Sequence, residues 1–584
     1  MKKLILILFI FSYSFGFEKC IELFNQEKYT EAYRCLQKIN SDEPLYPYSI
    51  YFRILIDSFY ERNTPYLKEL ERYKNTAIYS YTYLYLSSVT RFSQPEKAED
   101  YLKKIDEKAL LKEDLPFYYY LKAEILRRNG DESYKKYEKK LAVHFPYNRY
   151  YGFYTLKNKI KDLTEKELYI SIENLIRKRM YKRALYITEF LSNSQRKIFY
   201  KAILYGRIRD FSKAFSYLIL LKNNYRAEAA YQLIRINPAY PIQGAIFQIL
   251  KETKNKKLMI KAADFMMKRA FYREKWEDFS YYSSFIPESS SLYSDVIWYR
   301  FLKIYKKDRK KAGIYLEKRK RYFKDKEKIY YWLYLSFKGT KKAEIYLKKA
   351  ADIERNSFYA VRAREKLKRK LFKISDPKIT KNRELRMIEK LKKYLYRFAY
   401  IEGKYYLKTN KDKITLSSVM PELTAVYFSN RNSISVLSYP KPFKNIESKN
   451  LVYAFMRRES FFNPYAISVS NAVGLMQIIP STARWIAKKR KDKKFDITQL
   501  FIPEKNIDYG RWYIQYLLKK FRGNIFYSMA AYNCGPANVK KVLKKNRIRD
   551  IEEFIEFLPF RETRYYVKYV YTNYRAYQKL YKGK

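Results

Sequence analysis

The sequence predicts an all-α protein made of many short helices. Its 584 residues include only 13 Gly and 18 Pro but 66 Tyr, and Leu, Lys and Glu are also frequent. Few turn-forming residues among many helix-compatible ones favour helices joined by short connections. We expect an N-terminal superhelical array of helical hairpins, a helical linker domain and a C-terminal α domain.

Residues 1–16 have the pattern of a secretory signal peptide. Two lysines precede an apolar run from Leu4 to Phe11, and small residues lead to Gly16, where we place the cleavage. The apolar run is too short for a membrane span. We therefore expect export to a periplasm-like, oxidising compartment and no transmembrane span after cleavage.

Two cysteines lie in the first predicted hairpin, on either side of a turn near Glu27. An antiparallel hairpin would bring Cys20 and Cys35 together, and an oxidising compartment permits a disulfide bond between them. Two buried thiols are the alternative that the sequence leaves open.

Residues 17–370 repeat one theme, in which an alanine is followed by Tyr or Leu on the same helix face. Small residues in this pattern suit close helix contact, so we expect a curved stack of helical hairpins. This part shows no acid pair, phosphate-binding loop or metal-ligand spacing that would indicate a reaction. The repeated alanines are Ala32, Ala98, Ala184, Ala214, Ala312 and Ala343.

The rest of the chain divides at Pro440 and Pro442, which restrict the backbone and discourage helix. We assign residues 371–438 to a helical linker domain. Residues 439–584 then form a C-terminal domain of ordinary size for one core.

The formal net charge is +62, with Lys and Arg spread along the whole chain. Because no single tract carries this charge, we interpret it as a Lys-rich solvated surface. Loose attraction to an anionic polymer, such as a cell wall, follows from it. We expect no nucleic-acid partner, since the chain has an export signal and no recognised binding motif.

The single histidine, His144, excludes a Ser-His triad and any metal site that needs two His, unless Cys or carboxylates substitute. It lies far from the motifs described next, and we interpret it as structural. Catalysis must then rest on carboxylates, Tyr, Lys or Ser.

One carboxylate stands alone at the end of a predicted helix. Val452 and Phe455 belong to the apolar stripe of "NLVYAFMRRES", and Glu459 falls on the same stripe. Burial would raise the pKa of this carboxyl towards neutrality, as a general acid requires. The structural alternative is a buried Glu paired with an Arg.

Two later segments add ligand-facing features. Gly474 beside Leu and Met, followed by a helix that opens at Pro480, suits the wall of a groove for a flat polar polymer such as a glycan. "AAYNCGP" ends one helix and starts another. This places Tyr532 and Asn533 at a helix end, where their polar groups face a ligand.

Together, "RRES", "GLMQIIPSTA", "AAYNCGP" and "EFLPFRETRYYV" resemble the catalytic domain of the soluble lytic murein transglycosylases. The fold of that domain is similar to goose-type lysozyme. The match spans about residues 445–580 and its motifs are highly specific. The N-terminal repeats are similar to the long soluble members in architecture alone.

The resemblance implies roles for individual residues. Glu459 matches the catalytic acid/base. Where the family has Gly, this chain has Asn471, and Asn tolerates a left-handed backbone. Where the family has Ala, this chain has Cys534, which is also small and apolar in character. Matched substrate-binding residues are Ser468 and Tyr532 for the N-acetylmuramoyl sugar, Met476 and Gln477 for the groove, and Glu556 as a supporting acid.

The implied reaction cleaves the β-1,4 bond between N-acetylmuramic acid and N-acetylglucosamine in peptidoglycan glycan strands without water. Glu459 would protonate the leaving oxygen and then take the proton of the C6 hydroxyl, which closes a 1,6-anhydro ring. Tyr532 would orient the acetamido group and Ser468 would hold the sugar. No metal or cofactor is needed.

Two other functions stay open. A lysozyme-type hydrolase on the same fold would use Glu562 or Asp496 as a second carboxylate. A non-catalytic scaffold would bind glycan and recruit other cell-wall enzymes through its helical array.

Overall fold

The protein is all-α, as predicted, in a computed structural model of the chain. Within the described part, the only strands are β1 (Lys373–Ile374) and β2 (Ser433–Ile434), which pair in parallel. The predicted signal peptide lies outside the described residues. The structure describes residues 17–62, 65–148, 151–236, 238–375, 385–409, 412–430, 432–443, 446 and 449–582.

The chain forms two compact units, residues 1–180 with 377–428, and residues 181–376 with 429–584. The first unit contains α1 (Phe17–Asn25), α2 (Tyr29–Gln37), α3 (Tyr46–Phe59), α4 (Leu67–Leu70), η2 (Glu71–Tyr73), α5 (Ala77–Thr90), α6 (Pro95–Lys103), η3 (Glu107–Ala109), α7 (Leu115–Arg128), α8 (Tyr134–His144), α9 (Gly152–Lys159), η4 (Ile160–Asp162), α10 (Glu165–Arg177), α23 (Arg386–Tyr394), α24 (Tyr396–Thr409), α25 (Lys413–Ser417) and α26 (Pro421–Thr424).

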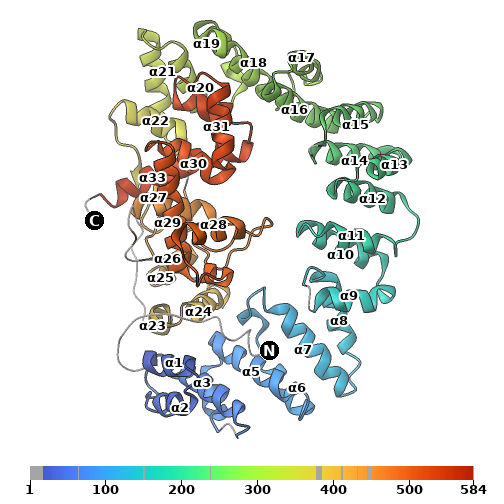
Figure 1. Cartoon of the computed structure of the whole chain (residues 1–584), viewed down its shortest axis with the longest axis vertical. Coiled ribbons are helices and arrows are strands. Elements are labelled where there is room, and N and C mark those ends of the chain that lie inside the picture. Colours follow the sequence, from blue (N-terminus) through green and yellow to red (C-terminus); the bar gives the residue numbers. More distant parts are fainter. Residues whose placement is uncertain are drawn as a thin grey trace. The chain divides into compact units, whose positions relative to one another are not determined.

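The second unit contains the strand pair and the remaining helices (Figure 1). These are α11 (Tyr181–Thr188), α12 (Gln195–Arg207), α13 (Phe211–Leu220), α14 (Asn223–Arg235), α15 (Tyr240–Glu252), α16 (Lys256–Arg273), α17 (Trp276–Ser284), α18 (Tyr293–Lys307), α19 (Arg309–Lys318), η5 (Lys320–Tyr322), α20 (Lys326–Ser336), α21 (Lys341–Asp352), α22 (Phe358–Lys366), α27 (Lys449–Glu459), α28 (Pro480–Arg490), η7 (Ile497–Phe501), α29 (Pro503–Lys520), α30 (Ile525–Cys534), α31 (Pro536–Lys545), α32 (Ile551–Phe557) and α33 (Arg561–Leu580).

Small residues allow successive helices to pack closely, as the repeated pattern predicts. All six repeated alanines are at most 2% exposed. At Gly313 on α19 a Cβ atom would lie 2.8 Å from the side chains of Ser336 and Phe337 at the end of α20. Because a larger residue has no room there, the small side chain sets the distance between these two helices.

The first hairpin is joined by a disulfide bond. Cys20 on α1 and Cys35 on α2 are bonded, with their Cα atoms 5.2 Å apart. The structure thus shows a disulfide in place of the two buried thiols that the sequence left open.

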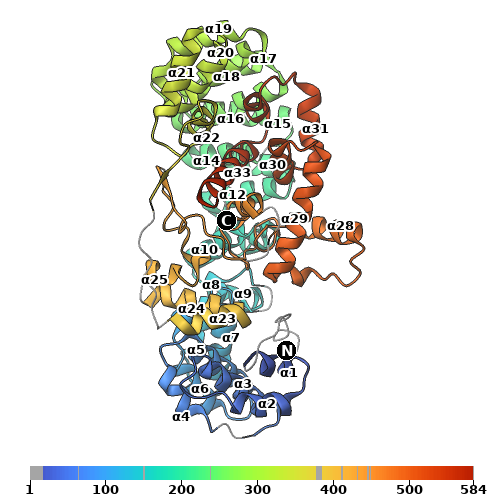
Figure 2. The same ribbon diagram turned by 90° about the vertical axis from the view of Figure 1, so that its left-hand side faces the viewer.

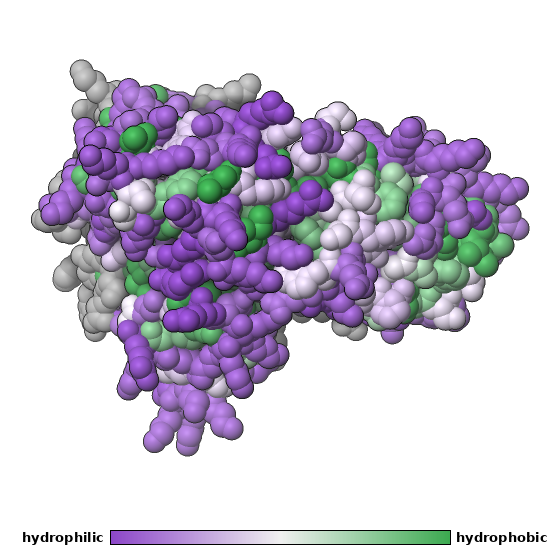
Figure 3. Space-filling view, turned by 90° about the horizontal axis from the view of Figure 1, so that it is seen from above, coloured by the Kyte–Doolittle hydropathy of each residue, from purple (hydrophilic) through white to green (hydrophobic). Residues whose placement is uncertain are grey.

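Hydrophilic side chains cover most of the face in Figure 3, with smaller hydrophobic groups between them.

Helices α23 to α26 pack into the first unit, where α24 lies beside α5 in both ribbon views (Figure 1, Figure 2). The buried carboxylate of Glu402 on α24 accepts hydrogen bonds from the amides of Ala77 and Ile78, at 2.8 and 2.9 Å. These amides open α5 and have no partner within the helix. The predicted linker therefore does not stand as a separate compact unit.

Helix α32 is fixed to the array of the second unit through three buried glutamates. A carboxylate removed from water needs charged or hydrogen-bonding partners. Since α32 leads directly into α33, these contacts also set where α33 begins. The contacts are Glu552 to Arg362 at 3.0 Å, Glu553 to Arg309 at 2.7 Å, and Glu556 to the Tyr359 hydroxyl at 2.7 Å.

Candidate active site

Glu459 is the last residue of α27, and the predicted apolar stripe leads to it. Val452 and Phe455 on this stripe are fully buried, and Glu459 itself is partly buried. Arg457 is buried as well, with its Nε donating to the Ser438 carbonyl at 2.9 Å, and sequence reasoning had not identified it as a core residue. The helix thus presents one carboxyl from an otherwise apolar face.

The surroundings of Glu459 give its carboxyl a raised pKa. Burial raises the pKa to about 7, the hydrogen bond from Tyr566 and the positive charge of Arg458 lower it, and the negative charge of Glu562 raises it. The Tyr566 hydroxyl donates to Oε1 of Glu459 at 2.5 Å. A carboxyl with such a pKa is present in both protonation states near neutral pH, so it serves as an acid or a base.

Three aromatic rings form the apolar side of this site. The rings of Phe455 and Tyr532 have centroids 4.8 Å apart, and those of Phe455 and Tyr566 are 6.2 Å apart. The Tyr532 hydroxyl donates to the carbonyl of Met476 at 2.8 Å. These rings exclude water from one side of Glu459, which explains the desolvation.

The loop between α27 and α28 is held in one conformation by its own backbone. Asn471 adopts a left-handed φ of 59°, as expected for the position where the family has Gly. The Ser468 hydroxyl oxygen accepts from the amides of Ser470 and Ala472, at 3.1 and 3.0 Å. The Gln477 side-chain amide donates to the Ala466 carbonyl at 3.0 Å. Ser468 and Gln477 therefore shape the loop themselves.

Asn506 on α29 organises this loop from within the core, and sequence reasoning missed it. Its Oδ1 accepts from the Met476 amide at 2.8 Å, and its Nδ2 donates to the carbonyls of Val473 and Leu500 at 3.0 and 2.7 Å. Met476 and Val473 lie 30 and 33 residues before Asn506 in the chain, whereas Leu500 is a near neighbour. A lone Asn within a helix gave no signal of this role.

We expect Gly474→Ala to lower the free energy of unfolding by about 2–4 kcal/mol. Gly474 has φ +76°, and a Cβ there would lie 2.2 Å from Nδ2 of Asn506 and 2.5 Å from the Leu500 carbonyl. Urea denaturation measures the change. Gly523→Ala is the matched control, because φ is +78° but nothing lies within 4 Å. Equal losses in both variants would contradict the steric argument.

Two predicted substrate contacts need correction. The Met476 side chain is fully buried, so this residue contributes its carbonyl to Tyr532 and does not line a groove with its thioether. Glu556 is 3% exposed and ion-paired with Lys568, whose charge, with that of Lys328, holds the pKa of Glu556 well below its usual range. The predicted contact of Glu556 with a sugar does not fit this burial.

Glu562, which opens α33, is the acid that the structure places near Glu459. It is exposed, and Oε1 of Glu562 accepts from Nδ2 of Asn533 at 3.4 Å. Asn533 also accepts from the Thr563 hydroxyl at 2.6 Å, so its amide faces the start of α33. The sequence around Pro559 does not show whether Glu556 or Glu562 faces the site. For this reason the sequence-based prediction assigned the supporting acid to Glu556.

The other acid considered for a second carboxylate, Asp496, has a local role. Its Oδ1 accepts from the Thr498 amide at 2.8 Å and so caps the 3₁₀ turn η7. Hydrogen bonds from Thr498 lower the pKa of Asp496. Among the described residues, no group of three or more His, Cys, Asp or Glu side chains has an arrangement that could hold a metal ion.

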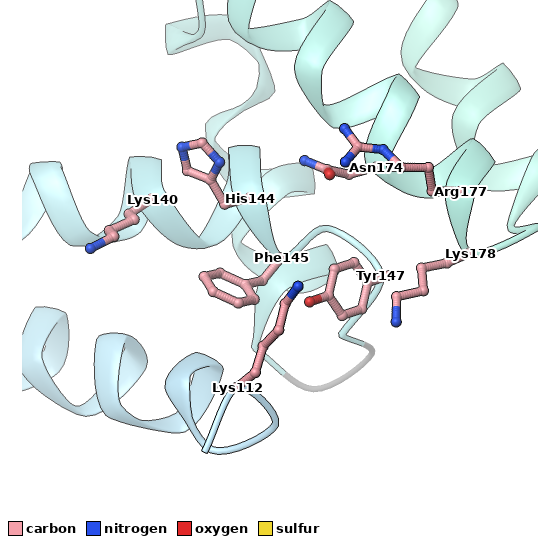
Figure 4. A pocket seen from close by; sticks show the side chains of 8 residues that line it. All are labelled: Lys112, Lys140, His144, Phe145, Tyr147, Asn174, Arg177 and Lys178. Carbon is pink, nitrogen blue, oxygen red and sulfur yellow. The ribbon is translucent and has the colours of Figure 1, made fainter. Parts of the chain in front are cut away.

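A basic cavity of about 440 Å³ lies in the first unit (Figure 4). None of its lining residues is a carboxylate, so it lacks a proton donor of the kind that Glu459 supplies. His144, interpreted from the sequence as structural, is an exposed residue at this cavity. The lining residues are Lys112, Lys140, His144, Phe145, Tyr147, Asn174, Arg177 and Lys178.

Comparison with known sequences identifies the part of the chain that carries Glu459. Residues 443–555 match the family model of the transglycosylase SLT domain. A soluble lytic murein transglycosylase of Escherichia coli (strain K12) is 39% identical over 154 residues, which cover 25% of this chain and 24% of that relative. The aligned segment therefore spans about a quarter of the length of this curated relative.

Comparison with solved structures extends over nearly the whole chain. The 70 kDa soluble lytic transglycosylase SLT70 of Escherichia coli has a TM-score of 0.66 at 19% identity, covering 96% of this chain and 95% of that chain. An inactive mutant of the lytic transglycosylase Slt of Pseudomonas aeruginosa has a TM-score of 0.53 at 17% identity, covering 94% and 96%. This likeness shows the fold, a helical superhelix with a lysozyme-like domain.

In the described part of the chain, no helix combines the length and the apolar character needed to cross a membrane.

The catalytic-domain motifs, the family match and the fold agree with one another. On these grounds residues 443–555 form a transglycosylase SLT domain, and the chain is similar in fold to the soluble lytic transglycosylases.

Proposed function

We propose that the protein cleaves the β-1,4 bond between N-acetylmuramic acid and N-acetylglucosamine in peptidoglycan, and that it forms 1,6-anhydromuramoyl ends without consuming water. The observation that carries this proposal is Glu459, a partly buried carboxyl with its pKa raised to about 7, within an SLT domain. The curated relative is named for the same activity, which supports the assignment.

The proposed reaction needs one protein carboxyl in two roles. Protonated Glu459 gives its proton to the glycosidic oxygen as the bond to the muramoyl C1 breaks, and the sugar's 2-acetamido group stabilises the cation that develops. The ionised carboxylate then removes the proton from the C6 hydroxyl, whose oxygen bonds to C1. Glu459 ends protonated again, and no water, metal or cofactor enters the balance.

The aromatic side chains give this carboxyl its position and its reactivity. Tyr566 fixes Oε1 through its hydroxyl, so the other carboxyl oxygen is the one that faces a substrate. Phe455 and Tyr532 keep water from the apolar side. The predicted contacts of Tyr532 with the acetamido group and of Ser468 with the sugar stay part of the proposal.

The mass of the products tests the proposal. Purified peptidoglycan digested by the full-length protein should release muropeptides that are one water lighter than those released by a hydrolase. Hydrated reducing ends alone would overturn the transglycosylase assignment in favour of a lysozyme-type hydrolase. An intact wall after prolonged digestion would favour a scaffold.

We expect kcat/KM for cleavage to fall as pH rises above about 7, because Glu459 must be protonated to start the reaction. Each further pH unit should lower the rate about tenfold, since the protonated fraction of free enzyme falls by that factor. Initial rates from about pH 5 to about pH 9 at constant ionic strength measure this. A rate that keeps rising through this range would contradict the acid role of Glu459.

A hydrolase remains the second candidate because Glu562 lies near enough to raise the pKa of Glu459. In the transglycosylase reaction Glu562 has no chemical step, so we expect Glu562→Gln to keep cleavage within about tenfold and to move the pH midpoint down. If Glu562 were the second carboxylate of a hydrolase, the same variant would lose about a thousandfold or more. Rates at several pH values separate these outcomes.

Localisation is part of the proposal. A wall polymer is reached only by an exported protein, which agrees with the predicted signal peptide. The disulfide between Cys20 and Cys35 fits an oxidising compartment such as the periplasm. Recruitment of other cell-wall enzymes stays a prediction.

A further inference from the structure

We propose that Trp485, Trp512 and Tyr516 form a stacking surface that binds sugar rings of the glycan strand beyond the cleavage point. The inference rests on the proposed function, because the glycan strand is the ligand that the site of Glu459 would hold. It assigns a binding role to two tryptophans on α28 and α29 that take no part in the chemistry.

The rings of this stacking surface contact one another closely. The centroids of Trp485 and Tyr516 are 5.0 Å apart, and those of Trp485 and Trp512 are 5.7 Å apart. Trp512 and Tyr516 lie 5.8 Å apart with their planes only 4° from parallel. Figure 1 and Figure 2 show α28 next to α29, the two helices that supply these rings.

Tyr513 connects the stacking surface to the catalytic site. Its ring centroid lies 6.1 Å from that of Tyr516, with nearly parallel planes, and 5.4 Å from that of Tyr532. Tyr532 in turn contacts Phe455, four residues before Glu459. The aromatic rings therefore continue outwards from the site in steps comparable to the size of one pyranose ring.

The stacking surface is not needed to fill the core. Trp485, Trp512 and Tyr516 are only partly buried, whereas Ile486 beside Trp485 and Leu517 beside Tyr516 are fully buried and pack the same helices. Grouped aromatic side chains that stay partly exposed usually mark a binding surface.

The chemistry of a pyranose suits these rings. The C–H groups on one face of the sugar form an apolar patch that stacks on an aromatic ring, while the hydroxyl groups at its edge stay solvated. Two stacked planes 4° apart offer such a flat face. Lys520 donates to the Tyr516 hydroxyl at 3.0 Å and adds a positive charge that attracts the carboxylates of peptidoglycan stem peptides.

The test compares a Trp485→Ala/Trp512→Ala variant of the full-length protein with wild type on long glycan strands and on a short muropeptide that ends near the cleavage point. We expect KM for long strands to rise about tenfold and kcat to change less than about twofold. The short substrate should be cleaved as by wild type. Tyr154→Ala, which removes an aromatic ring that is 65% exposed, is the matched control and should change neither value.

An equal loss on both substrates, or no change on either, would overturn the stacking surface. If the double variant does not fold, as judged by circular dichroism, Trp485→Gln alone replaces it, with an expected rise in KM of about threefold on long strands only. An unchanged KM in this folded variant would also overturn the inference.

A binding measurement separates this inference from the proposed function. In the Glu459→Gln background, long glycan strands should bind measurably by isothermal titration calorimetry, and adding Trp485→Ala/Trp512→Ala should weaken this binding about tenfold. If wild type fails to cleave peptidoglycan, the proposed reaction falls while this measurement still tests binding. If wild type cleaves but both tryptophans are dispensable for binding, only the stacking surface falls.

Discussion

Glu459→Gln is expected to lower kcat for peptidoglycan cleavage by about a thousandfold or more while the protein still folds. The amide has no proton to give at neutral pH and takes none from the C6 hydroxyl, so both halves of the proposed reaction are lost. Gln has the same shape as Glu, and its Oε1 still accepts from the Tyr566 hydroxyl. Rates measured by muropeptide release test this.

The same substitution should change stability in a pH-dependent way. The pKa of Glu459 is raised from 4.5 to about 7 on folding, so ionisation opposes folding. Below about pH 4.5 the residue is protonated in both states and no penalty exists. The penalty grows between these two pKa values and reaches about 3 kcal/mol above pH 7. Glu459→Gln should therefore be more stable than wild type at about pH 8 and equally stable at about pH 4.

An exposed carboxylate provides the control for both effects. Glu504 on the first turn of α29 is exposed, so Glu504→Gln should change neither the rate nor the pH dependence of unfolding. Near wild-type rates in Glu459→Gln would remove this residue from the mechanism. Equal stability of wild type and Glu459→Gln at both pH values would show that its carboxyl is not desolvated.

Arg362→Met should lower the free energy of unfolding by about 3 kcal/mol. Arg362 on α22 donates from Nε to Oε1 of Glu552 at 3.0 Å, and Glu552 is only 2% exposed. Met fills a similar volume but leaves this carboxylate buried without its cation. Urea denaturation followed by circular dichroism measures the loss.

A surface pair gives the matched control for Arg362→Met. Arg369 contacts Asp352 at 2.6 Å, but both side chains are exposed, so Arg369→Met should cost less than about 1 kcal/mol. Removing both partners through Arg362→Met/Glu552→Gln should recover part of the loss, because no charge is then left unpaired. Similar values for Arg362→Met and Arg369→Met would contradict the importance of the buried pair.

Periodicity and motifs were enough to predict the helical class and the position of Glu459. The apolar stripe of α27 repeats at helical spacing, and burial of Val452 and Phe455 follows from that spacing alone. The repeated alanines likewise indicated close helix packing. In each case the information is local, within one or two turns of a helix.

Contacts between distant segments could not be predicted in the same way. The role of Asn506 depends on the Met476 amide, thirty residues earlier in the chain, and the packing of α24 depends on the amides that open α5. The choice between Glu556 and Glu562 depends on the turn that separates α32 from α33. A single sequence does not give these directions, because residues on both sides of the turn are acidic and close in sequence.

The three glutamates of α32 bear on the order in which the protein is made. Arg309, Tyr359 and Arg362 all precede α32 in the chain by roughly two hundred residues. A polypeptide emerges from its amino end, so these three partners are already present when α32 appears. The carboxyl-terminal domain expressed alone would lack them: Glu552 would lose Arg362 and Tyr331, while Glu553 and Glu556 would keep Arg549 and Lys568.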